Sequence, residues 1–323
     1  MYLYIGQYLI FGKVYKPLSW GKIFKIREKE TIMAKVEANG IQIEYETFGE
    51  PDKPPVLLIV GLGQQMIAWD EEFCAQIAAR GYRVIRFDNR DTGLSTKLDE
   101  ADVPNMAVVF EAMIEGKPID SPYSILDMAD DAVGLLDALG IESSHVVGES
   151  MGGMIAQRMV IHHTDRVRTL TSIMSSTGEP GLPPPTPEAM DILVNRPPTD
   201  REGYLADYVE RWRVLNGQKL PYDEEASREL AAKIFDRGLN PPGFARQLTA
   251  VIADGSRKQP LKSVIVPTLV IHGDADPLVP FECGIDTANS VPGSELLIIE
   301  GMGHTFPRQV WAQVIDAIVR HAI

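Results

Sequence analysis

The sequence predicts an α/β fold in which a mostly parallel central sheet is flanked by helices and carries an inserted helical cap. Short apolar runs alternate with helical patterns over residues 33–175 and again over 261–323, which is typical of parallel strands joined by crossover helices. Residues 176–260 hold no strand pattern. With 323 residues, 45% of them apolar, the chain is long enough to build one large core that carries an insertion.

The first 32 residues form an atypical N-terminal extension to this domain. Their two glutamates are outnumbered by six cations, which are Lys13, Lys16, Lys22, Lys25, Arg27 and Lys29. Their apolar run, residues 1–11, is too short to cross a bilayer, and the positive charges follow it, whereas in a signal peptide they precede it. We expect Met33 to be the original start, and the alternative is an arm that touches a membrane.

The first part of the core, residues 33–175, opens with a hairpin. Alternating apolar residues flank Asn39-Gly40, a dipeptide that accepts the positive φ of a tight turn, so we expect two strands at the edge of the sheet. The pattern then predicts, in order, strand 56–60, helix 69–80, strand 83–87, helix 125–139, strand 145–147, a helix ending at 162 and strand 167–174. In the second part, residues 261–323, it predicts strands 268–271 and 295–299 and a last helix over 307–320.

The insertion, residues 176–260, begins with a proline-rich stretch and then predicts three helices. The first starts where Thr199 and Glu202 have capping-box spacing and ends at Gly217. Apolar residues at helical period predict the other two over 223–238 and 241–255. Lids built in this way usually cover an active site.

The bulk composition disfavours several classes of function. A net charge of −14 disfavours binding to nucleic acid or to an anionic membrane, so a small neutral or apolar substrate fits better. Cys74 and Cys283 are far apart and have no C-x-x-C spacing, which supports neither a disulfide scaffold nor a zinc site. We therefore expect two reduced core cysteines, no metal and a cytoplasmic protein.

A serine at a strand-to-helix turn is the strongest chemical signal. Gly148-Glu149-Ser150-Met151-Gly152 follows an apolar run and opens a helical stretch, which is the setting of a nucleophile elbow. The pentapeptide alone is weak evidence for a catalytic serine, and its position between a predicted strand and a predicted helix makes that evidence stronger. A serine needs an imidazole to take its proton and a carboxylate to hold that imidazole, so both partners must lie downstream.

Of the six histidines, only His304 lies in a glycine-flanked loop between a predicted strand and the last helix. We expect His145 and His272 to be core histidines, because His145 starts the strand before Ser150 and His272 ends a buried strand. Two carboxylates follow strand 268–271 at the carboxyl end of the sheet, where ligands bind in open α/β sheets. We favour Asp276 as the acid, because Asp274 is well placed to close the turn itself.

The oxyanion formed on attack needs two preorganised N–H donors. Met151, directly after the nucleophile, supplies one, and Leu62, in the loop after strand 56–60, is the candidate for the other. That loop is no dinucleotide fingerprint, because Met66 stands where the third glycine belongs, and no phosphate-binding loop motif occurs. We therefore expect no cofactor.

In this combination of motifs, the chain from about Ala34 to its end resembles the α/β-hydrolase family. The stretch 86–95, Arg-Phe-Asp-Asn-Arg-Asp-Thr-Gly-Leu-Ser, corresponds to a family signature, and with the stretch 63–73 it looks most like the aclacinomycin methylesterase-like esterases. Val60 and Asp91 depart from the commoner histidine and glycine of the family. The resemblance implies a carboxylic ester substrate and catalytic roles for Ser150, Asp276 and His304.

The predicted function is a serine hydrolase that cleaves a carboxylic ester, with methyl esters among the candidates, of a small and largely apolar molecule. Two alternatives remain: a cofactor-independent haloperoxidase or perhydrolase with the same triad, and a small-ligand receptor that retains the fold. Candidate substrate-binding residues are Met106, Trp212, Phe244 and Phe306. The oligomeric state is left open.

Overall fold

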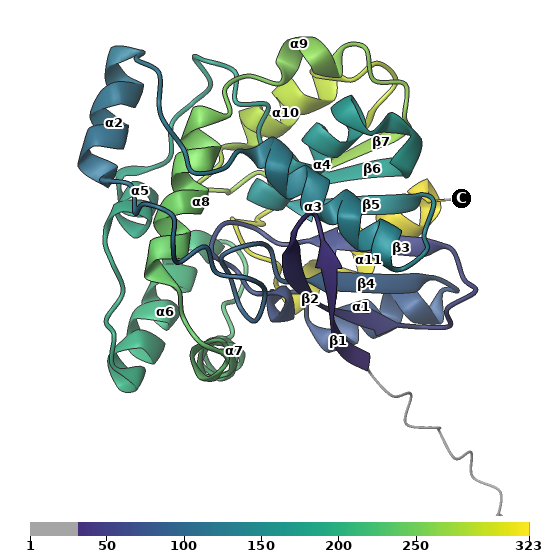
Figure 1. Cartoon of the computed structure of the whole chain (residues 1–323), viewed down its shortest axis with the longest axis horizontal. Coiled ribbons are helices and arrows are strands. Elements are labelled where there is room, and N and C mark those ends of the chain that lie inside the picture. The colour runs from purple at the N-terminus through teal and green to yellow at the C-terminus, as the bar shows by residue number, and fades with distance from the viewer. Residues whose placement is uncertain (1–31, 323) are drawn as a thin grey trace, which may run out of the picture. The chain divides into compact units, whose positions relative to one another are not determined.

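A computed structural model describes residues 32–322 of the chain (Figure 1). Nearly all of the predicted N-terminal extension lies outside these residues, so its two interpretations stay predictions. None of the helices among residues 32–322 is long and apolar enough to cross a membrane.

The core is one eight-stranded sheet with the order β1-β2-β4-β3-β5-β6-β7-β8 (Figure 1). The hairpin β1 (Ile32–Ala38) and β2 (Ile41–Phe48) forms one edge, and β2 pairs antiparallel with β4 (Arg83–Phe87). All other neighbouring pairs are parallel, as the alternating pattern predicts. From β4 the sheet continues through β3 (Pro55–Ile59), β5 (Ser144–Glu149), β6 (Val167–Ile173), β7 (Thr268–Gly273) and β8 (Glu295–Ile299).

Helices cover both faces of the sheet because the strands alternate their apolar side chains between two cores. On one face Leu57 and Val146 pack with α3 (Ile125–Ala138) and α4 (Met151–His162). On the other face Val56 and Val147 pack with α1 (Glu71–Ala79) and α11 (Arg308–His321). Short 3-10 helices span Met66–Ala68 and Thr164–Arg166.

The insertion between β6 and β7 is helical throughout its regular structure. It comprises α5 (Pro187–Val194), α6 (Arg201–Asn216), α7 (Glu224–Arg237), α8 (Pro241–Ala253) and α9 (Lys258–Leu261). The predicted capping box at Thr199 is wrong: the cap of α6 is Asp200, whose carboxylate accepts the Gly203 N–H at 2.9 Å. The sequence reasoning also missed α2 (Met106–Glu115), α5, α9 and α10 (Phe281–Ser290).

Candidate active site

Ser150 lies on the turn between β5 and α4 with φ +53°, a conformation that L-residues rarely adopt and that marks backbone strain. The flanking glycines make this turn possible. A Cβ at Gly148 would lie 2.1 Å from the Gly152 carbonyl oxygen, and a Cβ at Gly152 would lie 2.1 Å from that of Ile59. Strand and helix therefore approach each other closely, and the serine stands out between them.

His304, in the loop between β8 and α11, bridges the serine and a carboxylate. Its Nε2 lies 3.0 Å from Ser150 Oγ, and its Nδ1 lies 2.7 Å from Asp276 Oδ2. A carboxylate can only accept, so Nδ1 carries the proton and Nε2 is left to accept from the serine hydroxyl. Three side chains from distant parts of the sequence thus form one hydrogen-bonded chain.

The carboxylate in this hydrogen-bonded chain belongs to Asp276 and not to Asp274. Asp276 is buried, and its Oδ1 accepts the backbone N–H groups of Leu278 at 2.9 Å and Val279 at 2.8 Å. Burial alone would raise its pKa, but the charge of His304 and hydrogen bonds from His272 and His304 together outweigh burial and lower the pKa to about 2.

The Asp274 carboxylate faces a different partner. It accepts the Gly301 N–H at 2.7 Å and pairs with Lys219, so it holds the histidine loop from outside. Of the two histidines interpreted as core residues, His145 is buried and lies 3.0 Å from the Thr169 hydroxyl. His272 is also buried, with its Nε2 2.7 Å from the Val279 carbonyl oxygen.

The two candidate oxyanion donors lie on either side of the nucleophile. Met151 is the first residue of α4, where a backbone N–H has no partner within the helix. Leu62 lies in residues 61–64, here called the oxyanion loop, and a Cβ on Gly61 would lie only 3.2 Å from Ser150 Cβ. Within residues 32–322, neither the Leu62 nor the Met151 N–H donates a hydrogen bond to the protein. Both are free to donate to a ligand oxygen.

Glu149 is a charged neighbour of the site that the sequence reasoning did not single out. Burial raises the pKa of this carboxyl to about 7, although the charge of His304 and a backbone hydrogen bond from Gly61 oppose the rise. Burial also raises the pKa of Tyr208 on α6, and Glu149 contributes to that rise. The sequence could have drawn attention to Glu149 through its position in the pentapeptide 148–152, but a glutamate at that position does not by itself indicate a function.

The four candidate substrate-binding residues lie in different surroundings. Phe244 on α8 packs against Gly63 of the oxyanion loop. Phe306, two residues after His304, stacks edge-on against Trp69 and Phe73. Trp212 packs on Tyr208 within the insertion, and the Met106 sulfur accepts a hydrogen bond from Thr249 of α8 at 3.6 Å. Phe244 is thus the one that lies against the loop beside Ser150, and the binding roles of all four stay predictions.

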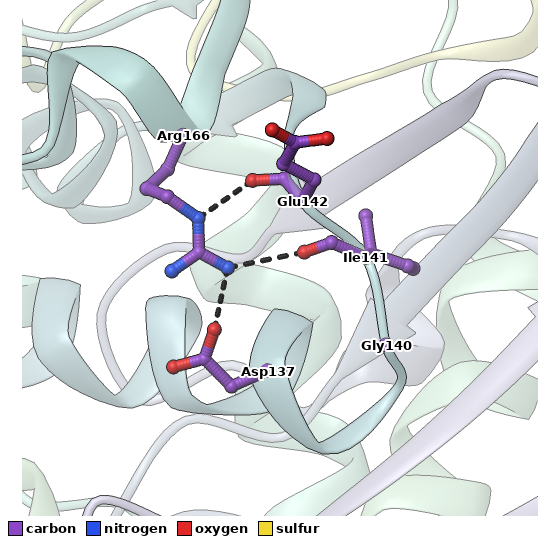
Figure 2. Close-up of a pocket in the computed structure, with 5 residues that line it drawn as sticks. All are labelled: Asp137, Gly140, Ile141, Glu142 and Arg166. Carbon is purple, nitrogen blue, oxygen red and sulfur yellow. Dashed lines mark hydrogen bonds and ion pairs between the residues drawn. The ribbon is translucent and has the colours of Figure 1, made fainter.

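Two further observations concern parts of the described chain away from Ser150. Residues 32–322 hold no group of three or more histidine, cysteine, aspartate or glutamate side chains that could bind a metal ion. A surface hollow beside α3 is lined by Asp137, Gly140, Ile141, Glu142 and Arg166 (Figure 2). The Arg166 guanidinium there already donates to the Asp137 carboxylate and to the Ile141 and Glu142 carbonyl oxygens, so the hollow is not a competing candidate.

Comparisons with known proteins agree with this architecture. A family model described as the alpha/beta hydrolase fold matches residues 54–307. Rhodomycin D methylesterase DnrP of Streptomyces peucetius is 31% identical over 297 residues, which cover 85% of this chain and 93% of that protein. Non-heme chloroperoxidase CPO-A1 of Kitasatospora aureofaciens is 29% identical, covering 82% of this chain and 90% of that protein.

Among solved structures, the meta-cleavage product hydrolase CumD of Pseudomonas fluorescens IP01 superposes with a TM-score of 0.69. The alignment covers 89% of this chain and 96% of that one at 20% identity. At that identity the likeness shows the fold alone.

Proposed function

We propose that this chain, which belongs to the α/β-hydrolase fold family, is a serine hydrolase that cleaves a carboxylic ester of a small, largely apolar molecule. One observation carries the proposal: the hydrogen-bonded chain from the Ser150 hydroxyl through His304 to the Asp276 carboxylate. The low pKa of Asp276 keeps a negative charge beside the imidazole over the whole physiological pH range, so the charge is present whenever the imidazole takes a proton.

The first half-reaction is an attack of the Ser150 oxygen on the ester carbonyl carbon. His304 Nε2, 3.0 Å away, accepts the hydroxyl proton as the new C–O bond forms. The Leu62 and Met151 N–H groups donate to the carbonyl oxygen as it becomes an oxyanion. When the tetrahedral intermediate collapses, the alcohol leaves with the proton that His304 returns, and the acyl group stays on Ser150.

The second half-reaction repeats this sequence with water as the nucleophile. His304 accepts a proton from the water, hydroxide adds to the acyl carbon, and the proton then returns to the Ser150 oxygen as the acid is released. This route needs only side chains and backbone N–H groups that the protein itself supplies. The similarity to a protein named rhodomycin D methylesterase supports a methyl ester as the scissile group.

The test is a comparison of wild-type protein with Ser150→Ala on p-nitrophenyl acetate and on a panel of methyl esters. We expect Ser150→Ala to keep the wild-type thermal unfolding midpoint and to lose turnover by about 10⁴-fold or more. Mass spectrometry of wild-type protein mixed rapidly with ester should show an acyl group on Ser150. Turnover near the wild-type rate in Ser150→Ala would overturn the proposal.

A second candidate is a haloperoxidase or perhydrolase reaction at the same serine, favoured by the similarity to non-heme chloroperoxidase CPO-A1. Here hydrogen peroxide instead of water would attack the acyl-enzyme, and a peracid would leave. Halide oxidation that depends on peroxide, on a carboxylic acid and on Ser150 identifies this activity. A rate far below that of ester hydrolysis argues against it as the main function.

Several expectations remain predictions about the whole chain. Cys74 and Cys283 are both buried and unbridged, which supports a cytoplasmic location. The division into an extension (1–32), two core parts (33–175 and 261–323) and a cap (176–260) can be tested by limited proteolysis. We expect the first cleavages before residue 33 and in the proline-rich stretch after residue 176.

A further inference from the structure

Helix α8 belongs to the insertion, yet it holds the oxyanion loop of the core. Gln247 on α8 is completely buried, and its Oε1 accepts the Gly63 N–H at 2.9 Å. Its Nε2 donates to the Arg90 carbonyl oxygen at 2.7 Å, in the loop that follows β4. One side chain of the insertion thus links two core loops, and both of its polar ends are used.

The hydrogen bond to Gly63 fixes one peptide of the loop, the one that joins Leu62 and Gly63. The Gln64 N–H donates to the Gly61 carbonyl oxygen at 3.2 Å and closes a four-residue turn, in which Gly63 has φ +68°. A positive φ at this third position belongs to a type II turn, and the type I turn differs by rotation of the peptide that joins Leu62 and Gly63. Glycine permits both, so something outside the turn must select one.

Two contacts from α8 make this selection. Gln247 provides the acceptor for the Gly63 N–H in its observed direction. The Phe244 ring, one helical turn earlier, packs so closely that a Cβ on Gly63 would lie 2.6 Å from its Cδ2. Rotation of the Leu62–Gly63 peptide would break the first contact and leave a buried polar group of Gln247 without a partner, which is unfavourable.

We propose that Gln247 is a positioning residue that, by fixing the Leu62–Gly63 peptide and tying it to the loop after β4, keeps the oxyanion loop and with it the Leu62 N–H in place beside Ser150. The inference rests on the proposed serine hydrolase function and assigns the insertion a second task besides its predicted one of covering the site. The histidine loop shows the same arrangement, because the His304 N–H donates at 2.7 Å to the carbonyl oxygen of Leu215, near the end of α6. Both loops that approach Ser150 are therefore fastened to the insertion.

The test compares Gln247→Met, which keeps the length of the side chain and removes both hydrogen bonds, with Gln247→Glu, which keeps an acceptor for the Gly63 N–H. The matched control is Thr249→Val, which removes another buried hydrogen-bonding group from the same helix. Its hydroxyl bonds to the Ala245 carbonyl oxygen and the Met106 sulfur, not to the oxyanion loop. Each variant is assayed on p-nitrophenyl acetate well below its unfolding midpoint. Inhibition by a trifluoromethyl ketone, which forms the tetrahedral adduct, is measured beside its methyl ketone analogue.

We expect Gln247→Met to lower kcat/KM about 10- to 100-fold, less than complete removal of an oxyanion donor does. The trifluoromethyl ketone should lose affinity by the same factor, while the methyl ketone and Thr249→Val stay within about twofold of wild type. Gln247→Glu should retain more activity than Gln247→Met. Equal losses of affinity for the two ketones, or wild-type kcat/KM in Gln247→Met, would overturn the inference, whereas an active Ser150→Ala would overturn the proposed function itself.

Discussion

Replacement of Glu149 by glutamine is expected to stabilise the protein above neutral pH. The folded structure raises the pKa of this carboxyl from 4.5 to about 7, because burial removes hydration from the charged form. The folded state therefore binds the proton more tightly than the unfolded chain does, and stability is lost as the pH rises from about 4.5 to 7 and the carboxyl ionises. A shift of that size in a fully buried group corresponds to about 3 kcal/mol.

Glu149 is half-buried rather than fully enclosed, so water screens part of this cost and we expect about 1–2 kcal/mol. Glutamine has the same shape and cannot ionise, so Glu149→Gln should match wild type near pH 4.5 and exceed it by that amount at pH 8. Urea unfolding followed by tryptophan fluorescence at a series of pH values measures the difference. A difference that stays constant with pH, or wild type being more stable at pH 8, would refute the reasoning.

Three further predictions follow from the geometry. Asp276→Asn should lower kcat/KM by about 10⁴-fold, and a loss below about tenfold in steady-state assays would contradict its role. It should also cost up to about 2 kcal/mol of stability at neutral pH, because the lowered pKa of Asp276 means that the folded state favours its charged form, although the amide oxygen still accepts the two turn N–H groups. Gly152→Ala should lower the free energy of unfolding in urea by about 2–3 kcal/mol and reduce activity, because the new Cβ collides with the Ile59 carbonyl oxygen of β3. Wild-type stability and activity in this variant would contradict the prediction, because the turn at Ser150 would then tolerate a Cβ. Arg246→Met should lower the free energy of unfolding by about 3–5 kcal/mol, because Asp91 stays charged and buried without the guanidinium. Adding Asp91→Asn to Arg246→Met should restore at least half of that loss. If the losses of the two single variants simply add in the double variant, the two residues are not coupled.

The positions of the strands along the chain and the strand-to-helix turn at Ser150 could be predicted because both are encoded locally. Each strand is a short apolar run, and Asn39-Gly40 takes the positive φ values, +48° and +77°, that a tight hairpin needs. Among the helices that were missed, α2 has a weak local signal. In α2 the apolar residues do not form one buried stripe: only Val109 is buried, while Ile114 is 80% exposed. A periodicity argument depends on one buried face and fails where there is none.

The candidate site likewise contains residues that could be predicted from the sequence and a residue that could not. Ser150, His304 and Asp276 could be selected because each stands at the end of a predicted strand, and the carboxyl ends of parallel strands meet at one edge of the sheet. Gln247 could not, because it lies 184 positions from the glycine it contacts and its helix shows only which residues share a face. Contacts between an insertion and a core loop depend on tertiary packing, for which one sequence holds no local pattern.

Asp91 shows how such a contact explains a departure from the family pattern. It has φ +68°, a conformation that favours the glycine common at this position, so an aspartate here bears backbone strain. The strain is offset by its carboxylate, which is buried, accepts a bidentate pair of hydrogen bonds from Arg246 of α8 at 2.7 and 2.8 Å, and accepts the Tyr123 hydroxyl at 2.9 Å. Since Arg246 directly precedes Gln247, this ion pair holds α8 at the depth from which Gln247 reaches the oxyanion loop. A glycine at position 91 would relieve the strain and remove the partner of Arg246, so the aspartate belongs to the same set of contacts through which we propose that Gln247 positions the oxyanion loop.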